Sequence, residues 1–522
     1  MQSKARTAGV AGLFLTILAS AGNPALEAPS ATGHPARIRF EVRAAPGLLD
    51  GPASGRLLVA VGRTPSPEPR EGIGTTGRDA APLLGRDVTA LGPGDRVVLD
   101  RNSALFPLAQ LGDLPPGDYW IQAVLRTNRD LLLTGAPGNL LSAPVAAHLD
   151  PERSSTVRLT LDRRLPEESL PPDTEWLRFV KWRSEALSTF WGRPMYLRAG
   201  IVLPRGWADE PERRYPLLIT IGGFGTRFTS VQEAMREGHP FREAWLADDA
   251  PRFIRLQLDG AGPLGDPYQV DSDNHGPCGQ ALVKELIPEI ESRFRGLGTP
   301  ESRVLTGGST GGWVSLALQV LYPEFFGGCW SGYPDPPDFR ALQLVDIYRH
   351  TNAFVNEWGF ERPCAREVNG DTRFTMRHET QLENVLGDGD SFVRSGGQWG
   401  SWNAAYSPRG RDGLPLPIWD PRTGRLDPAV ADAWARHDLR RHLETRWAQS
   451  GPALRGKIRI WMGDADTYFL DGAVRLFDGF LKGVHPPADA RIEFSPGQPH
   501  GWEPRTWKQL LAEMAAVTGS PR

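Results

Sequence analysis

The sequence contains few cysteines and no excess of charge of either sign. Its 522 residues include 3 Cys, 59 basic and 62 acidic residues, which gives a net charge of -3. Three Cys are too few for a disulfide scaffold. The balanced charge, with no basic segment standing out, argues against nucleic acid as a partner. Hydrophobic residues make up 40% of the chain, an ordinary share that excludes a wholly disordered or fibrous protein.

Long hydrophobic runs are absent after the first 21 residues. A membrane-spanning helix needs about 20 consecutive apolar residues, and no later segment provides them, so we expect no integral membrane segment. Residues 1–21 combine a cationic start, an apolar stretch and a small-residue ending, which is the layout of a secretory signal peptide. We therefore expect an exported protein, secreted or periplasmic, in which residues 22–35 form a Pro/Ala-rich linker.

The three cysteines allow two interpretations. In an oxidising compartment one pair can form a disulfide, and Cys329–Cys364 is the preferred pair. Three buried thiols, with Cys278 included, are an equally good interpretation. The sequence does not decide between them.

Short segments of β character dominate residues 36–165. Each segment alternates apolar and polar residues or is rich in β-branched ones, and none is followed by a long helical pattern. The segments cover residues 38–42, 57–61, 96–99, 119–125 and 156–161. This pattern predicts an antiparallel, Ig-like β-sandwich domain.

From residue 190 onward, apolar strands alternate with helical segments. Leu217–Ile221 and Phe253–Leu258 are nearly continuous apolar runs, typical of strands buried on both faces of a parallel sheet. Residues 280–294 place their apolar side chains on one helical face. This alternation predicts an α/β domain over residues 190–522, with a Pro/Gly- and aromatic-rich, lid-like insert at 332–455. The expected fold class is therefore α/β, preceded by a β-sandwich domain.

The strongest local motif is Gly307-Gly308-Ser309-Thr310-Gly311, which has the form G-x-S-x-G. It lies between a strand pattern at residues 303–306 and a helical pattern that begins at Gly312. A nucleophilic serine projects from a tight strand-to-helix turn, where flanking glycines remove the Cβ atoms that would collide. This context favours Ser309 as a nucleophile over a bystander in a glycine-rich loop.

A nucleophilic serine needs a general base, and the base needs an orienting acid. After a motif of this kind the chain order is Ser, acid, His. Asp464 and Asp466 both follow the expected strand at 458–462. We prefer Asp466, because the loop must leave the strand before a side chain can turn back, and Asp464 remains the alternative.

Of the ten histidines, only His485 and His500 follow this acid. His485 precedes two prolines and is interpreted as a surface turn residue. His500 lies in a Gly/Pro-rich loop between a strand at 491–494 and a final helix, which is the expected place for the base.

Attack on a carbonyl also requires two backbone donors for the developing oxyanion. Thr310, the residue after the serine, is expected to supply one of them. The glycine-rich loop after Leu217–Ile221 is expected to supply the other, from Phe224 or Gly223. The alternative for this loop is a turn that only reverses the chain.

These segments resemble the putative esterase family of α/β-hydrolases, which includes esterase D-like, feruloyl and enterochelin esterases. The resemblance covers about residues 195–330 and 455–515, and its motifs are Gly200–Pro204, 215–218 with the glycine-rich loop, 271–277, 285–288, Gly307–Gly312 and His500. It implies an ester hydrolase with Ser309 as nucleophile and His500 as base. The sequence departs from the family at Gly222, where many members have His before the oxyanion-loop glycines.

No metal or cofactor is implied by the sequence. It contains no H-E-x-x-H, paired C-x-x-C or Walker-type motif. Asp271, Asp273 and Asn274 lack the 12-residue pattern of a calcium loop, so we interpret them as a polar turn.

Tryptophan is abundant, with 17 residues in the chain. Nearly half of them fall in about a quarter of the sequence, at positions 330, 358, 399, 402, 419, 434, 447 and 461. For most of them we favour a role in the core of the insert over a lid that stacks on an aromatic acyl group or a sugar. Trp399 and Trp402, which stand among small residues, are the pair expected to be exposed and to bind substrate.

Three functional hypotheses follow. The first is an exported serine hydrolase that cleaves a small-molecule or carbohydrate-linked carboxylic ester through an acyl-enzyme. The second is an acyltransferase or serine peptidase with the same triad. The third is a non-catalytic carbohydrate- or surface-binding protein on a hydrolase scaffold. The oligomeric state stays open.

Overall fold

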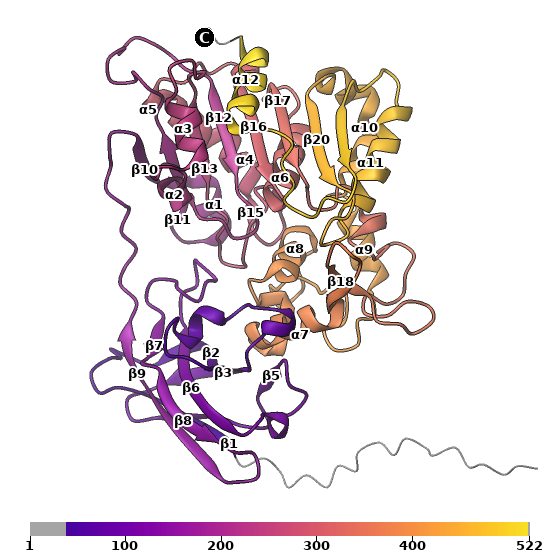
Figure 1. The fold of residues 1–522 in the computed structure, drawn as a ribbon. Helices are drawn as coiled ribbons and strands as arrows, with labels where there is room; N and C mark the ends of the chain where they lie inside the picture. The colour runs from indigo at the N-terminus through magenta and orange to yellow at the C-terminus, as the bar shows by residue number, and fades with distance from the viewer. Residues whose placement is uncertain (1–37, 520–522) are drawn as a thin grey trace, which may run out of the picture.

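The computed structural model describes residues 38–519, which form a strand-rich region and an α/β region (Figure 1). The expected signal peptide, residues 1–21, and linker, residues 22–35, lie outside the described residues. Within residues 38–519, no helix combines the length and the apolar character that crossing a membrane requires.

The strand-rich region contains nine strands that share one hydrogen-bonded sheet. They are β1 (Ile38–Ala44), β2 (Ala53–Gly62), β3 (Leu83–Leu91), β4 (Arg96–Leu99), β5 (Ala104–Phe106), β6 (Gly117–Arg126), β7 (Leu140–Ser142), β8 (Val145–Leu149) and β9 (Ser155–Arg164). The order is β4-β1-β9-β7-β6-β2-β3-β5, with β8 also paired to β6. The predicted β-rich domain is therefore present, but its strands share a single sheet and β1 pairs with β9 in parallel.

The α/β region is built on an eight-stranded sheet of order β10-β11-β13-β12-β16-β17-β20-β21. The strands are β10 (Leu177–Ser184), β11 (Met195–Val202), β12 (Leu217–Ile221), β13 (Ile254–Leu258), β16 (Arg303–Gly308), β17 (Gly328–Gly332), β20 (Ile458–Gly463) and β21 (Arg491–Ser495). From β13 to β21 every neighbouring pair is parallel. The expected α/β architecture is confirmed, although β10 places the start of the sheet before the predicted boundary at residue 190.

Helices cover both faces of this sheet and build the insert. They are α1 (Glu185–Trp191), α2 (Val231–Ala234), α3 (Pro240–Leu246), α4 (Cys278–Ala281), α5 (Ile287–Phe294), α6 (Thr310–Leu321), α7 (Met376–Leu386), α8 (Gln398–Tyr406), α9 (Pro428–Trp434), α10 (Leu439–Leu454), α11 (Asp471–Gly483) and α12 (Trp507–Thr518). The helix predicted at 280–294 is interrupted by a π-helical turn at Leu282–Leu286. Pro288 follows this turn and has no N–H to donate, which disrupts the regular α-helical ladder.

The insert lies between β17 and β20 and holds a small hairpin of β18 (Pro363–Arg366) and β19 (Thr372–Thr375). Its tryptophans form a buried core, in which Trp399 contacts both Trp402 and Trp419 edge to face at 4.8 and 4.9 Å between ring centroids. The expectation that Trp399 and Trp402 are exposed is wrong, because each is only 1% exposed. Trp358 and Phe360 are the large exposed aromatics of this segment, at 77% and 71%.

The cysteines are three buried free thiols, so the preferred Cys329–Cys364 disulfide is wrong. Cys329 lies on the central strand β17, whereas Cys364 lies on β18 of the insert. The Cys364 thiol instead contacts Glu379 Oε2 at 2.7 Å and Gln343 Oε1 at 3.4 Å. The alternative of three buried thiols is the one that the structure supports.

Strand β2 joins the two regions because it buries both of its faces. Successive side chains on a strand point to opposite faces. Leu57, Val59 and Val61 pack in the core of the strand-rich region, whereas Leu58 and Ala60 share an apolar cluster with side chains of α7 from the insert. Figure 1 shows α7 lying beside β5 at this junction.

We expect Leu58→Ala to lower the free energy of unfolding by about 2–5 kcal/mol, because it leaves a cavity in a fully buried cluster. Urea denaturation followed by tryptophan fluorescence measures this change. Leu297→Ala is the control, since Leu297 is 41% exposed, and it should change stability by less than about 0.5 kcal/mol. Equal effects of the two substitutions would contradict the packing of β2 on α7.

Candidate active site

Ser309 occupies a strained turn between β16 and α6. Its φ is 59° and its ψ is -126°, a conformation that non-glycine residues rarely adopt. The turn is possible because its glycines have no side chains: a Cβ on Gly307 would lie 2.4 Å from Ile221 O, and a Cβ on Gly311 would lie 2.1 Å from the same atom. The Ser309 N–H donates to Gly332 O at 3.0 Å, which ties the turn to β17.

His500 and Asp466 are brought together from the loops after β21 and β20. His500 Nδ1 lies 2.7 Å from Asp466 Oδ2. The Asp466 side chain is fully buried, and its other oxygen accepts from the N–H groups of Tyr468 and Leu470 at 2.8 and 3.2 Å. The carboxylate therefore orients the imidazole so that Nε2 faces away from it.

Asp464, the alternative acid, and His485, the other histidine after it, do not contact His500 or Asp466 in this arrangement. Asp464 Oδ1 accepts from the Gly497 N–H at 2.6 Å, so this carboxylate fastens the loop that carries His500 and does not contact its ring. His485 is exposed after α11, in the turn before Pro486.

The glycine-rich loop after β12 faces the serine. A Cβ built on Gly223 would lie 3.8 Å from Ser309 Cβ, and Phe224 lines a cavity together with Ser309 and His500. Thr310, the third predicted oxyanion residue, is fully buried at the first position of α6. A Cβ on Gly222 would lie 2.3 Å from the Thr226 side chain, which explains why this loop has no larger residue at that position.

Asp335 is a buried carboxylate beside this site that the sequence reasoning missed. Its Oδ2 accepts from Thr310 Oγ1 at 2.8 Å and from Tyr268 Oη at 2.7 Å. Burial raises the pKa of Asp335 above its usual value, although the hydrogen bonds from Tyr268 and Thr310 and the nearby His500 act to lower it. Asp335 thus fixes the side chain of the residue after the serine. Its position just beyond the end of β17 is a signal that could have identified it.

Ser309 and His500 open into two cavities. One, of about 520 Å³, is also lined by Phe224, Asp335 and Trp402. The other, of about 1,030 Å³, lies on the side of Gly222 and Gly223 and extends towards α3 and α12. Trp402 therefore borders the first cavity despite its burial, whereas Trp399 lines neither of them.

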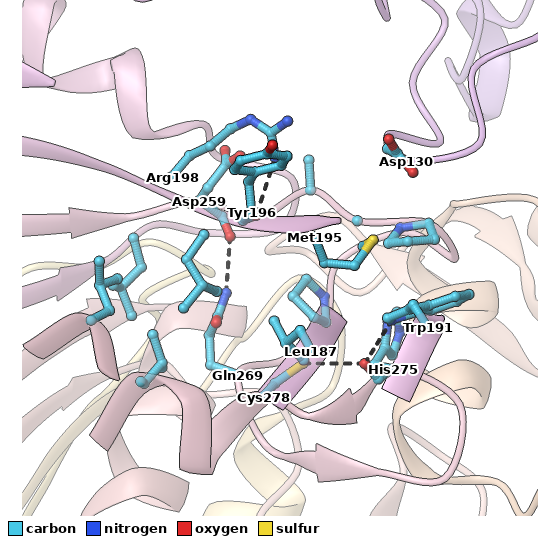
Figure 2. A pocket seen from close by; sticks show the side chains of 18 of the residues that line it. Asp130, Leu187, Trp191, Met195, Tyr196, Arg198, Asp259, Gln269, His275 and Cys278 are labelled. Atoms are coloured by element: carbon cyan, nitrogen blue, oxygen red, sulfur yellow. Dashed lines mark hydrogen bonds between the residues drawn. The ribbon is translucent and has the colours of Figure 1, made fainter. Parts of the chain in front are cut away.

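A smaller cavity of about 60 Å³ contains neither Ser309 nor His500. Figure 2 shows its Trp191, His275 and Cys278 side by side, with Trp191 Nε1 and Cys278 Sγ donating to His275 O at 3.2 and 3.7 Å. His275 is 2% exposed, and its ring Nε2 has no hydrogen-bond partner among the described residues. Burial lowers the pKa of His275 to about 4, so the ring is neutral at pH 7.

Within residues 38–519, no group of three or more His, Cys, Asp or Glu side chains is placed to hold a metal ion. The polar turn considered for calcium is engaged in protein contacts. Asp273 pairs with Arg436 at 2.7 Å, and Asn274 Nδ2 donates to Ala404 O and Ser407 O at 3.0 and 2.8 Å.

Comparison with protein families gives a match to the model described as Putative esterase, over residues 192–516. The chain belongs to this family. The esterase is therefore a carboxylic ester hydrolase of the α/β-hydrolase fold, and the matched range includes the insert as well as Ser309, Asp466 and His500. A search of curated proteins gives no match.

Solved structures similar to the esterase include three hydrolases. A ferulic acid esterase is 15% identical over 66% of this chain and 97% of its own, with a TM-score of 0.36. An S-formylglutathione hydrolase from Agrobacterium tumefaciens is 14% identical over 67% and 97%, with a TM-score of 0.35. The fluorophosphonate-binding serine hydrolase F of Staphylococcus aureus is 12% identical over 66% and 98%, with a TM-score of 0.37. The family assignment rests on the family model and not on these structures.

We expect buried His275 to make the esterase less stable as the pH falls. Its folded pKa of about 4 lies below its unfolded value of 6.5, so the stability it contributes is present above pH 6.5 and is lost as the pH falls towards 4. Between pH 7 and pH 5 the loss amounts to about 2 kcal/mol.

Urea denaturation at pH 7 and pH 5 tests this expectation by comparing the native chain with His275→Gln. Burial raises the pKa of Asp266 to about 7 and that of Glu383 to about 8, so these acids make the fold more stable as the pH falls, opposite to His275. Because both proteins contain these acids, the difference between the two proteins isolates the effect of His275. The variant should lose less stability than the native chain over this interval. An equal loss in both proteins would contradict the prediction.

Proposed function

We propose that the esterase hydrolyses carboxylic esters through an acyl-enzyme on Ser309, with His500 as general base and Asp466 as the orienting acid. The observation that carries this proposal is the 2.7 Å contact between His500 Nδ1 and Asp466 Oδ2, in a site where His500 shares two cavities with the strained serine. Asp464 is not assigned this role, because its carboxylate bonds to the loop backbone.

In the first half of the reaction, Ser309 Oγ attacks the ester carbonyl carbon while its proton passes to His500 Nε2. The carbon–oxygen bond to the alcohol then breaks, and the departing alcohol takes the proton from His500. In the second half, water attacks the acyl-enzyme, gives its proton to His500 and releases the acid, after which the proton returns to Ser309. Asp466 stabilises the imidazolium that forms in both halves.

The oxyanion formed in each half needs backbone donors. We assign one donor to the N–H of Thr310 and the other to the loop at Gly223 and Phe224, which faces Ser309. Thr310 is held at its side chain by Asp335, since its hydroxyl donates to that carboxylate at 2.8 Å. A hydrogen-bond donor that is fixed before the reaction stabilises the transition state more than a donor that must be ordered during the reaction.

The proposal extends to location and substrate. The signal-peptide layout of residues 1–21 supports export to the periplasm or the medium. We propose a small-molecule or carbohydrate-linked ester as the substrate, because the cavities that meet at Ser309 are of the size that small-molecule sites have.

Ser309→Ala should lower kcat for p-nitrophenyl acetate by on the order of 10⁴ or more, since it removes the nucleophile. The same variant should no longer be labelled by a fluorophosphonate probe, which the native chain should take up. A native chain that is not labelled and does not cleave esters would instead support a non-catalytic binding protein. Circular dichroism checks that the variant is folded.

Asp466→Asn should lower kcat by on the order of 10⁴, because an amide in place of the carboxylate favours the wrong imidazole tautomer. Asp464→Asn is the matched control two residues away, and it should change kcat by less than about tenfold because Asp464 does not contact His500. The measurement is kcat for p-nitrophenyl acetate at pH 7. A larger loss in Asp464→Asn than in Asp466→Asn would reverse the assignment of the acid.

Product analysis separates hydrolysis from the related reactions. Added alcohols compete with water for the acyl-enzyme, so the yield of new ester measures acyl transfer. A panel of peptides measures peptidase activity.

A further inference from the structure

The 520 Å³ cavity is bounded by the strand-rich region as well as by the α/β region. Ile73, Leu132, Leu133 and Thr134 line it together with Ser309 and His500. These four residues lie in two loops, 73–76 before β3 and 132–134 after β6. From the walls of this cavity we infer that the two loops bind part of the ester, so that the N-terminal region selects the substrate. This inference rests on the function proposed for Ser309.

The loop at 132–134 is held rigidly in position. Asn139 Nδ2 donates to Leu133 O at 2.9 Å and to Thr134 O at 3.1 Å. The Leu132 N–H donates to Gly262 O of the α/β region at 3.0 Å. The Leu132 side chain also packs against Gly396 of the insert, where an added Cβ would lie 2.9 Å from Leu132 Cγ. The loop is thus already fixed to both other walls of the cavity.

The loop at 73–76 is held by the insert. Ile73 packs against the apolar cluster that β2 shares with α7. Just beyond the loop, the Gly77 N–H donates to His378 Nε2 on α7 at 3.0 Å. Both loops therefore face the serine without needing a movement of the N-terminal region.

The contact between β2 of the strand-rich region and the insert includes a buried charged side chain. Arg56 on β2 is 1% exposed, and its guanidinium bonds Asp87 of its own region and Asp390 of the insert at 2.8 Å each. It also donates to Val385 O on α7 at 3.0 Å. Asp87 and Asp390 are about half exposed, but the buried arginine and the apolar cluster beside it are unlike the polar interface of two freely moving domains.

The chemistry of the two loops indicates which part of an ester they contact. Ile73, Leu132 and Leu133 are apolar, and Phe374 and Leu382 of the insert line the same cavity. Its volume lies within the range of roughly 300–1,000 Å³ typical of small-molecule sites and exceeds what a short acyl chain fills. The structure therefore assigns to this cavity a bulky ester group with an apolar face.

Charged side chains also border the cavity, and each is engaged within the protein. The Arg126 guanidinium donates to Leu386 O and Ser395 O. Glu383 accepts from Ser395 Oγ and from the N–H groups at the start of α8. Arg126 Nε has no hydrogen-bond partner among the described residues, but the other polar atoms named here are bonded within the protein. The apolar side chains of the two loops are therefore the main surface left to bind the substrate.

The test narrows the cavity from the N-terminal side. Leu133→Trp adds bulk to one loop, and Ala146→Trp adds the same residue at an exposed position on β8 of the same region. Both proteins are assayed with p-nitrophenyl acetate, with p-nitrophenyl decanoate and 3-phenylpropanoate for bulk in the acyl group, and with 2-naphthyl acetate for bulk in the alcohol.

We expect Leu133→Trp to lower kcat/KM for the bulky esters of at least one series by roughly tenfold or more, while p-nitrophenyl acetate changes less than about twofold. Ala146→Trp should leave all four rates unchanged. An unchanged ratio of bulky to small esters in Leu133→Trp, whether all rates fall together or none does, would overturn the inference. Failure of the proposed function is recognised separately, as acetate hydrolysis that persists in Ser309→Ala.

Discussion

Ser309 keeps its left-handed backbone only because the residues around it leave room for the turn. The carbonyl oxygen of Ile221 occupies the space where Cβ atoms of Gly307 and Gly311 would lie, and Gly332 O accepts the Ser309 N–H. The turn is therefore clamped between β12 and β17, its two neighbours in the sheet. Strain of this kind persists only where the surrounding structure determines it, so the position of Ser309, the proposed nucleophile, depends on the register of three parallel strands.

The same parallel sheet also brings the other two residues into place. The carboxyl ends of parallel strands lie along one edge, where α/β proteins build their sites. Asp466 and His500 follow β20 and β21, which are separated from β16 by β17. The chain can therefore interpose more than a hundred residues between serine and acid without displacing either, because the insert leaves after β17 and returns at β20.

The parts of the fold that are local in sequence could be predicted. The strands at 217–221 and 96–99 match the structure residue for residue, and the motif around Ser309 indicated its turn, because both depend on neighbouring residues. The exposure of Trp399 and Trp402 could not be predicted in this way. Their small neighbours, which suggested an open loop, in fact allow α8 to pack closely, as Gly400 does against Phe392 O and Ser395 Oγ. Asp335 was missed for a related reason, since its partner Tyr268 lies 67 residues away.

The packing of the N-terminal region against the rest of the chain also depends on contacts between residues that are distant in sequence. From sequence this region is a separate β-rich unit, because its short strand patterns are not followed by the long helical patterns found in the rest of the chain. In the structure both faces of β2 are packed, with Leu57 facing the core of its own region and Leu58 facing α7. A strand that is apolar on both faces needs a packing layer on each of them. The run of apolar residues in β2 therefore already required a partner layer, and the insert is that layer. A cavity whose walls come from three such interlocked parts is shaped by all of them. On the inference drawn above, the substrate range of this esterase depends on the whole chain and not on the hydrolase sheet alone.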